Sequence, residues 1–275
     1  MTPDETITSP SNPRIRAAAA LRDADARRDT GLTLVDGRRE LARACASGRV
    51  PTEIFVDADA PPIADTAWLA AAADRGARVI SVARRAFEKI AFGSRNEGVV
   101  GVVPFTVPDL AGSRFSAGRP LLIVEGVEKP GNLGAILRSV DATGLAGVVV
   151  CDGRTDVANP AVIRASLGTV FTVPLAAATA AETIGWCATT GRRVVAAMPT
   201  GQTLWHAARL AGDVAILVGS EAHGVSPAWT AAAAAGTIDM VSVRLPMRGV
   251  ADSLNVSVTA AVLAYEALRQ EESRP

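Results

Sequence analysis

Two continuous apolar runs constrain this chain more than any other feature. Residues 121–124 (LLIV) and 214–218 (VAILV) are unbroken apolar stretches, and each stops abruptly at a glutamate or a glycine. A strand of this kind is buried on both faces, which requires helices on both sides and favours parallel pairing. Helix-like segments separate the strand-like segments along the whole chain, so the sequence predicts an α/β fold.

The second half of the chain shows this alternation from residue 120 to its end. Its predicted strands are 121–127, 146–152, 169–174, 192–198, 213–220 and 241–246. Its predicted helices are 132–144, 159–168, 180–191, 227–236 and 254–271. In the last helix, a helical spacing predicts a face directed to the core. That face carries Leu254, Val258, Ala261, Val262 and Tyr265.

The first half shows a similar alternation and predicts a small α/β layer with parallel pairing. Its predicted helices are 14–28, 38–48, 66–76 and 84–91, and its predicted strands are 32–35, 53–56, 78–82 and 98–105. The stretch TVPDLAGSRFSAGRP then lacks apolar periodicity, as a linker does. We therefore expect one domain at 1–108, a linker at 109–119 and a second domain at 120–275.

Positive charge is concentrated near the N-terminus, although the formal net charge of the 275 residues is zero. One helix-length stretch carries Arg14, Arg16, Arg22, Arg27 and Arg28, with aspartates between them. Mixed charges of this kind are typical of a solvated helix face. The alternative is an arm that contacts phosphate groups, for which the candidate RNA-binding residues are Arg14, Arg16, Arg27 and Arg28.

Several classes of protein are disfavoured by the composition. No apolar run approaches the roughly 18 residues that span a bilayer, and no stretch has the pattern of a signal peptide. The three cysteines, Cys45, Cys151 and Cys187, have neither a metal-ligand nor a disulfide spacing. We expect a cytoplasmic protein without membrane contact and without a bound metal.

Polar residues follow three of the predicted strands. Asn132 and Arg138 follow the first, with Asn132 expected as a helix N-cap, and the second run ends in Gly219-Ser220-Glu221-Ala-His-Gly224. The last strand leads to RLPMRGVADSLNVSV, in which Ser253 and Asn255 precede the final helix. Carboxyl ends of parallel strands meet at one edge of a sheet, so these segments predict one ligand site. Taken singly, each could instead be a cap, a surface arginine or an ordinary turn.

Together the three segments resemble the three motifs of the SpoU/TrmH-type RNA ribose methyltransferases of the SPOUT superfamily. The first motif is Asn132-x-Gly134-x-x-x-Arg138, and the second is Gly219-Ser220-Glu221-x-x-Gly224. The third is Leu245-Pro246-Met247 followed by Ser253-Leu254-Asn255-Val256-Ser257. The N-terminal half is similar to the family's ribosomal-protein-like RNA-binding domain, with Asp36 where the family usually has glutamate.

The resemblance implies a parallel sheet with a deep trefoil knot, a homodimer and S-adenosyl-L-methionine as methyl donor. It implies methylation of a ribose 2′-hydroxyl, for which large-subunit ribosomal RNA is the expected substrate and transfer RNA the alternative. The implied catalytic residues are Arg138, Asn132, Glu221, Ser253 and Asn255. The implied cofactor-binding residues are Gly219, Ser220, Leu245, Met247, Ser253, Leu254, Pro199 and Gly201.

The implied reaction leaves the role of Arg138 open. Because a guanidinium keeps its proton, we expect Arg138 to bind a phosphate and stabilise negative charge on the ribose oxygen rather than act as a base. Two alternatives to the enzyme remain at this point, namely a non-catalytic RNA-binding protein of the same fold and a small-molecule enzyme with a nucleotide cofactor. The chain lacks the glycine-rich fingerprints of Rossmann and P-loop proteins, which disfavours the second.

Overall fold

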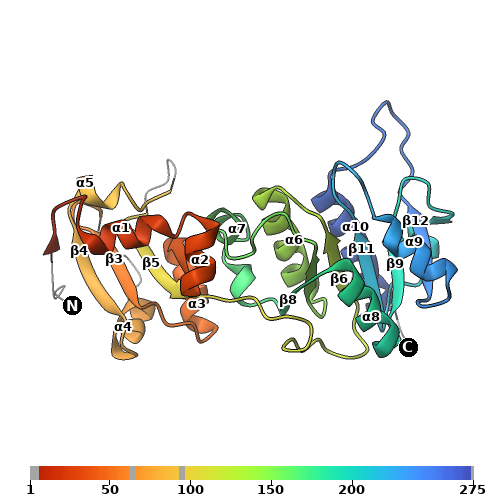
Figure 1. The fold of residues 1–275 in the computed structure, drawn as a ribbon, viewed down its shortest axis with the longest axis horizontal. Helices are drawn as coiled ribbons and strands as arrows, with labels where there is room; N and C mark the ends of the chain where they lie inside the picture. The colour runs from red at the N-terminus through yellow and green to blue at the C-terminus, as the bar shows by residue number, and fades with distance from the viewer. Residues whose placement is uncertain (1–5, 62–65, 93–96, 274–275) are drawn as a thin grey trace. The chain divides into compact units, whose positions relative to one another are not determined.

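Two β-sheets organise the chain, one in each of two units (Figure 1). The computed structural model describes residues 6–61, 66–92 and 97–273. Unit 1 comprises Met1–Thr106 and Asp156–Thr172, and unit 2 comprises Val107–Thr155 and Val173–Pro275. Within the described residues, no helix is both long enough and apolar enough to cross a bilayer.

The sheet of unit 1 is mixed, so the prediction of parallel pairing is confirmed for β1–β4 and β3–β4 and wrong for the two pairs that β5 makes. Its strand order is β1-β4-β3-β5-β2, in which β5 runs antiparallel to both of its neighbours. A central strand is buried on both faces in either direction, so an apolar run alone does not determine its orientation. The strands are β1 (Thr6–Ile7), β2 (Leu32–Asp36), β3 (Glu53–Asp57), β4 (Arg78–Val82) and β5 (Val99–Pro104).

The predicted helix at 14–28 is two helices, because the chain turns between them. They are α1 (Pro13–Ala20) and α2 (Ala24–Thr30), and Asp23 Oδ1 caps α2 by accepting the backbone N–H of Asp25 at 2.8 Å. Gly31 ends α2 in the left-handed region, as expected. The other helices of this first segment are α3 (Arg38–Ala46), α4 (Ala67–Asp74) and α5 (Arg84–Phe87).

Residues 156–172 pack in unit 1, although the sequence predicts them within the second domain. They form α7 (Pro160–Ala165) and the 3-10 helix η1 (Thr169–Phe171), where a strand at 169–174 is predicted. The hydroxyl of Thr33 in β2 donates to the Ala158 carbonyl at 2.6 Å. Phe171 packs edge-on against Phe105, with ring centroids 5.1 Å apart. These partners are distant in sequence, so local patterns do not report them.

Asp36, at the end of β2, is a buried carboxyl that faces α7. Its Oδ2 lies 3.2 Å from the Arg164 guanidinium and accepts the backbone N–H of Phe92, whereas Oδ1 has no hydrogen-bond partner among the described residues. Burial raises the pKa of Asp36 to about 6, and Glu97 and Glu40 add to the shift. The carboxyl therefore takes up a proton more readily in the folded chain than in the unfolded one.

Unit 2 contains an entirely parallel sheet, as predicted, in the order β10-β12-β9-β11-β6-β7-β8. Its first strands are β6 (Leu121–Glu125), β7 (Val148–Cys151), β8 (Leu175–Ala178) and β9 (Arg193–Ala197). The others are β10 (Thr203–Leu204), β11 (Val214–Val218) and β12 (Met240–Arg244). The helices are α6 (Pro130–Thr143), α8 (Ala180–Thr190), η2 (Trp205–Ala207), α9 (Pro227–Ala234) and α10 (Val256–Glu272).

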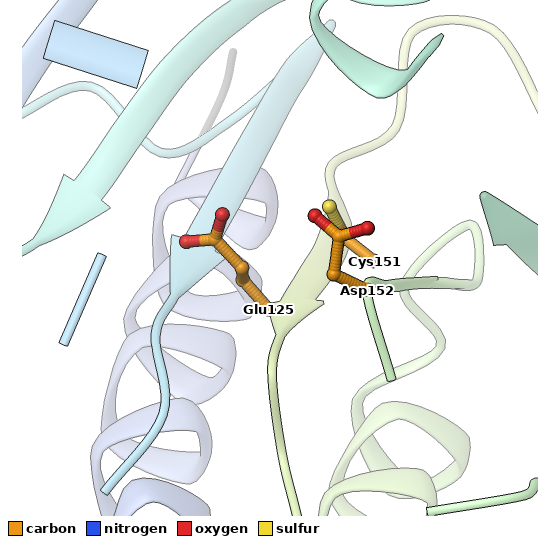
Figure 2. Close-up of side chains that lie close together, drawn as sticks. All are labelled: Glu125, Cys151 and Asp152. Atoms are coloured by element: carbon orange, nitrogen blue, oxygen red, sulfur yellow. The ribbon is translucent and has the colours of Figure 1, made fainter. Parts of the chain in front are cut away.

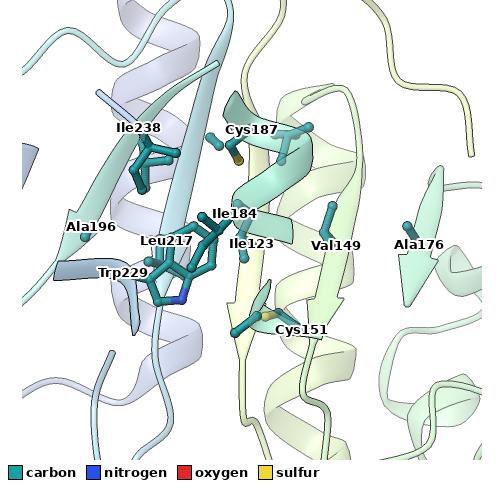
Figure 3. Close-up of a cluster of buried hydrophobic side chains, with 14 of the residues drawn as sticks. Ile123, Val149, Cys151, Ala176, Ile184, Cys187, Ala196, Leu217, Trp229 and Ile238 are labelled. Carbon is teal, nitrogen blue, oxygen red and sulfur yellow. The ribbon is translucent and has the colours of Figure 1, made fainter. Parts of the chain in front are cut away.

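One face of this sheet packs against α8 and α9. Ile123 of β6 and Leu217 of β11 meet Ile184 of α8 and the fully buried Trp229 of α9 in one apolar cluster (Figure 3). Alternate residues of the same strands point to the opposite face and are equally buried, for example Leu122 in β6. The two-sided burial predicted from the apolar runs is therefore present.

The residues expected to form a linker are held against unit 2. The Ser113 hydroxyl donates to the Leu175 carbonyl at 2.8 Å, and the backbone N–H of Gly118 donates to Asp213 Oδ1 at 2.8 Å. The buried Arg192 donates to the carbonyls of Arg119 and Ser116 at 3.0 and 3.1 Å. The polar composition of residues 109–119 predicts an irregular segment. Hydrogen bonds from residues distant in the sequence fix it in place.

The predicted core face of the last helix is wrong. Leu254, Val258 and Tyr265 are 40%, 46% and 55% exposed. The buried face of α10 carries Val256, Ala260, Leu263, Ala264 and Ala267 instead. Both sides of this helix are apolar, so helical spacing fits either one, and the smaller side chains pack inward.

The raised pKa of Asp36 gives a testable pH dependence. The Asp36 carboxyl contributes fully to the free energy of unfolding below its unfolded pKa of 3.8. This contribution is lost as the pH rises through the folded pKa of about 6. The shift corresponds to about 3 kcal/mol of unfolding free energy. In calorimetry on the full chain, Asp36→Asn should remove this decline between about pH 4 and 6. Asp29→Asn, at an exposed position, is the control, and an unchanged pH profile in Asp36→Asn would contradict the assignment.

Candidate functional site

A cavity of about 580 Å³ lies at the carboxyl edge of the unit 2 sheet. Its walls come from the segments that follow β9, β11 and β12 and from the first turn of α10. Apolar residues, including Val218, Leu245, Met247 and Leu254, line it together with polar residues such as Ser220, Ser253 and Thr259. This volume and lining are typical of a small-molecule site. Of the three predicted segments, those that follow β11 and β12 therefore line one cavity, whereas Asn132 and Arg138 of the first segment are not in its lining.

The turn after β11 forms one wall, and its backbone is tightly packed. Ser220 and Gly224 exchange backbone hydrogen bonds of 3.1 and 2.9 Å, and Ser220 Oγ accepts the N–H of His223 at 3.0 Å. A Cβ atom on Gly219 would lie 2.1 Å from the Gly224 carbonyl carbon. Only glycine fits at residue 219, and the turn it permits places Ser220 and Glu221 in the cavity wall.

A chain of hydrogen bonds joins one residue from each of the three sequence motifs. Asn255 caps α10, its Oδ1 accepting the N–H of Ser257 at 2.9 Å, so its Nδ2 is left to donate. That Nδ2 donates to Asn132 Oδ1 at 3.2 Å, and Asn132 Nδ2 donates to Glu221 Oε1. Since a backbone N–H can only donate, the cap determines the orientation of both amides.

Asn132 does not cap its helix, which corrects the prediction from sequence. The N-cap of α6 is Lys129, with Pro130 at the first helical position, and Asn132 lies within the first turn. Its side chain is free of the helix backbone and reaches Asn255 and Glu221 instead. A cap and a first-turn position both suit asparagine, so only the tertiary partners distinguish them.

Most of the predicted cofactor residues line the cavity. They are Gly219, Ser220, Leu245, Met247, Ser253, Leu254 and Pro199. Gly201 is not in the lining, because it packs against β12, where an added Cβ would lie 2.4 Å from the Val243 carbonyl carbon. Met198, His223 and Asp252 also line the cavity, although the sequence did not single them out. His223 occupies an unspecified position of the second motif. Its place inside that motif is the feature of the sequence that could have indicated a role in the site.

Arg138 lies outside the cavity lining of its own chain. It is exposed on α6, six residues after Asn132, which turns it about 240° around the helix axis from that residue. Within the part of the chain that the structure describes, its guanidinium has no recorded hydrogen bond or ion pair. The predicted cluster of catalytic residues is therefore assembled in one chain except for this arginine.

The four candidate RNA-binding arginines of unit 1 differ in exposure. Arg27 is buried, and its guanidinium binds Asp156 Oδ2 at 2.7 Å and two backbone carbonyls, so it holds unit 1 together. Arg14 lies 3.4 Å from Glu53, and Arg28 pairs with Asp25 on the surface. Arg16 is exposed. Arg27 is thus unavailable to a phosphate, whereas the others lie at least partly on the surface.

Glu125, Cys151 and Asp152 lie together where β6 and β7 end (Figure 2). Both oxygens of Glu125 already accept hydrogen bonds, from the N–H and hydroxyl of Ser226 and from the Trp229 indole at 2.8, 2.7 and 3.0 Å. Burial raises the pKa of the Cys151 thiol to about 12, so the thiol stays protonated. Protein donors occupy this cluster, and its chemistry does not fit a metal site.

Comparison with known proteins places both halves of the chain. Residues 119–265 match the model of the SpoU rRNA Methylase family, and residues 12–101 match an MRM3-like substrate binding domain. A crystal structure of an RNA 2′-O ribose methyltransferase is 35% identical, with a TM-score of 0.80, and 96% of this chain aligns with 98% of that one.

Two further relatives have more specific names. The AdoMet-bound rRNA methyltransferase from Sinorhizobium meliloti is 25% identical with a TM-score of 0.84, over 96% of this chain and 97% of that one. The 23S rRNA (guanosine(2553)-2'-O)-methyltransferase RlmP from Bacillus subtilis is 26% identical over 94% of this chain and 97% of its own.

The packing around Gly219 predicts a difference between two glycine substitutions. Gly219→Ala forces the backbone of the turn to move and should cost about 1–3 kcal/mol of unfolding free energy, measured by thermal denaturation. Gly131→Ala adds a methyl group where nothing lies within 4 Å and should be neutral or slightly stabilising in its helix. Equal stability of the two variants would contradict the assigned role of Gly219.

Proposed function

The chain belongs to the SpoU rRNA methylase family, and on that premise we propose that it methylates a ribose 2′-hydroxyl in large-subunit ribosomal RNA. The observation that carries the proposal is the hydrogen-bonded chain of Asn255, Asn132 and Glu221 beside the cavity. A non-catalytic RNA-binding protein would have no need of this arrangement. The ribosomal target is supported by the names of relatives that align over nearly the whole chain.

S-adenosyl-L-methionine supplies the methyl group when it is bound. The cavity fits this cofactor in size and in lining, since about 580 Å³ bordered by both apolar and polar residues is typical of a small-molecule site. Gly219, Leu245, Met247 and Leu254 would hold the cofactor. Ser253 and Asn255 lie at the same wall and would position the ribose hydroxyl.

The polar chain would act by restricting geometry. Glu221 accepts a hydrogen bond from Asn132, which accepts one from Asn255, so the amide next to the reacting hydroxyl has one orientation. Fixed dipoles of this kind stabilise developing charge without a cost of reorganisation during the reaction. Arg138 would bind a phosphate of the RNA and stabilise negative charge on the ribose oxygen.

A homodimer is part of the proposal, for two reasons. The exposed side of α10 is an apolar stripe of Val258, Ala261, Val262 and Tyr265, beside the exposed Leu254. Arg138 lies outside the cavity of its own chain, as it would if it completed the site of a second copy.

The proposal also includes a trefoil knot in unit 2, which the all-parallel sheet and the likeness to solved relatives support.

Unit 1 would recognise the RNA. The match of residues 12–101 to a substrate binding domain supports this role, with Arg14, Arg16 and Arg28 as candidate phosphate contacts. A cytoplasmic location is also proposed, in keeping with free, buried thiols at Cys45, Cys151 and Cys187.

The decisive experiment incubates the protein with methyl-labelled S-adenosyl-L-methionine and total RNA, followed by mapping of the labelled nucleotide. Label at one ribose of large-subunit ribosomal RNA is the expected result. Label confined to transfer RNA would redirect the proposal to that substrate. Absence of label from every RNA fraction, with cofactor binding intact in calorimetry, would favour the non-catalytic alternative.

The dual role of Asn255 changes which substitution tests it. Asn255→Ala would remove the cap of α10, worth about 1 kcal/mol, along with the link to Asn132. Asn255→Asp keeps the capping oxygen but removes the donor to Asn132. We expect normal thermal stability and a loss of methyl transfer on the order of 100-fold.

Asn159→Asp is the matched control, because Asn159 caps α7 in unit 1 in the same way. It should leave both stability and methyl transfer unchanged. A wild-type transfer rate in Asn255→Asp would show that the hydrogen-bonded chain is only structural.

The apolar stripe of α10 predicts the effect of a charge on association. Val258→Asp should shift the protein from dimer to monomer in sedimentation velocity, since a buried carboxylate at the interface would be unpaired. Ala181→Asp, on the exposed first turn of α8, should leave the dimer intact. A monomeric wild-type protein, or a dimer that tolerates Val258→Asp, would contradict this interface.

A further inference from the structure

Methyl transfer to a hydroxyl releases a proton, and neither Arg138 nor the serine and asparagine side chains of the site accept it. This inference rests on the proposed function. Arg138 keeps its proton at any physiological pH, and serine and asparagine side chains are not bases. The acceptor must lie near the hydroxyl that Ser253 and Asn255 would position, and therefore in the lining of the cavity.

Three lining residues carry side chains that can accept a proton, namely Glu221, His223 and Asp252. Glu221 already accepts from Asn132, and its charge anchors the chain of amides. Asp252 accepts from the Ser253 hydroxyl at 3.1 Å. A free carboxylate is also a weak base at neutral pH, whereas imidazole exchanges its proton there.

The imidazole of His223 makes no hydrogen bond to any residue that the structure describes, so both ring nitrogens are available. Its backbone is fixed nevertheless, because its N–H donates to Ser220 Oγ at 3.0 Å within the turn closed by Ser220 and Gly224. Beneath that turn, Glu125 holds the N–H of Ser226 at 2.8 Å. His223 is exposed and belongs to the lining of the cavity, and the hydrogen bonds of the turn fix its backbone there.

We propose that His223 is the proton acceptor of the methyl transfer. The ribose 2′-oxygen forms a bond to the methyl carbon while the carbon–sulfur bond breaks and its electron pair stays on sulfur. The hydroxyl proton passes to a ring nitrogen of His223, which becomes an imidazolium and later loses the proton to water. Glu221 and Asp252 line the same cavity, and Glu125 accepts the N–H of Ser226 just after the turn; these carboxyl groups would stabilise the imidazolium.

The chain contains two histidines, which makes the test unusually clean. His206 is absent from the cavity lining and packs edge-on against Trp205, with ring centroids 5.4 Å apart. His223→Gln and the control His206→Gln are compared in single-turnover methyl transfer to the RNA fraction that the wild type labels, across about pH 5 to 9. Binding of S-adenosyl-L-methionine is measured separately by calorimetry on each variant.

The expected result is a loss of transfer on the order of 100-fold in His223→Gln, with cofactor binding retained. The fall in wild-type rate at low pH should disappear in that variant, because it reports protonation of the acceptor. Added imidazole should partly restore transfer in His223→Ala. In NMR spectra, the ring signal of His223 should move when the cofactor binds, whereas that of His206 should not.

Two outcomes would overturn the inference while leaving the proposed function intact. One is a His223→Gln variant that transfers methyl groups at the wild-type rate with the same pH profile. The other is loss of transfer in His223→Ala without rescue by imidazole and together with loss of cofactor binding, which would make the residue a binding contact. A wild-type protein that labels no RNA would instead defeat the proposed function itself.

Discussion

The buried carboxylate of Glu125 is the interaction on which the site depends most. An isolated charge in the interior is costly, and three donors from the turn after β11 and from α9 compensate for it. Through these bonds the end of β6 holds Ser226 and Trp229, and Trp229 is fully buried in the core of unit 2. The turn from Gly219 to Gly224 is thereby held between a packed strand and a packed helix.

A second constraint acts through the start of α10. Asn255 accepts a backbone N–H there, so its amide has one orientation and its Nδ2 donates to Asn132. The amide of Asn132 is thereby oriented as well, and its Nδ2 donates to Glu221. Secondary structure thus determines the donor and acceptor pattern of a site whose residues are up to 123 positions apart. A helix cap is locally encoded, and here it has a consequence that is not local.

Two segments, α10 and the N-terminal arginine-rich stretch, show what sequence patterns fail to predict. In α10 both sides are apolar, and the spacing fits the exposed stripe as well as the buried one, so the wrong face was predicted. In the N-terminal stretch, five arginines look alike in sequence, yet Arg27 is buried against Asp156. Its partner follows 129 residues later, in a segment that packs in unit 1. Periodicity reports local conformation and carries no information on such partners.

The sequence by itself determined the two-sided burial of the strands in unit 2, the parallel sheet there and the three motif segments at its carboxyl edge. These follow from local chemistry, since apolar runs, caps and glycine turns act within a few residues. Only the tertiary structure decided that Asn132 bonds to Asn255 and Glu221 rather than capping α6, and that residues 156–172 pack in unit 1. It also placed His223 in the cavity wall and Arg138 outside it. Each of these depends on which distant segments meet, and the free energy of that choice comes from long-range packing.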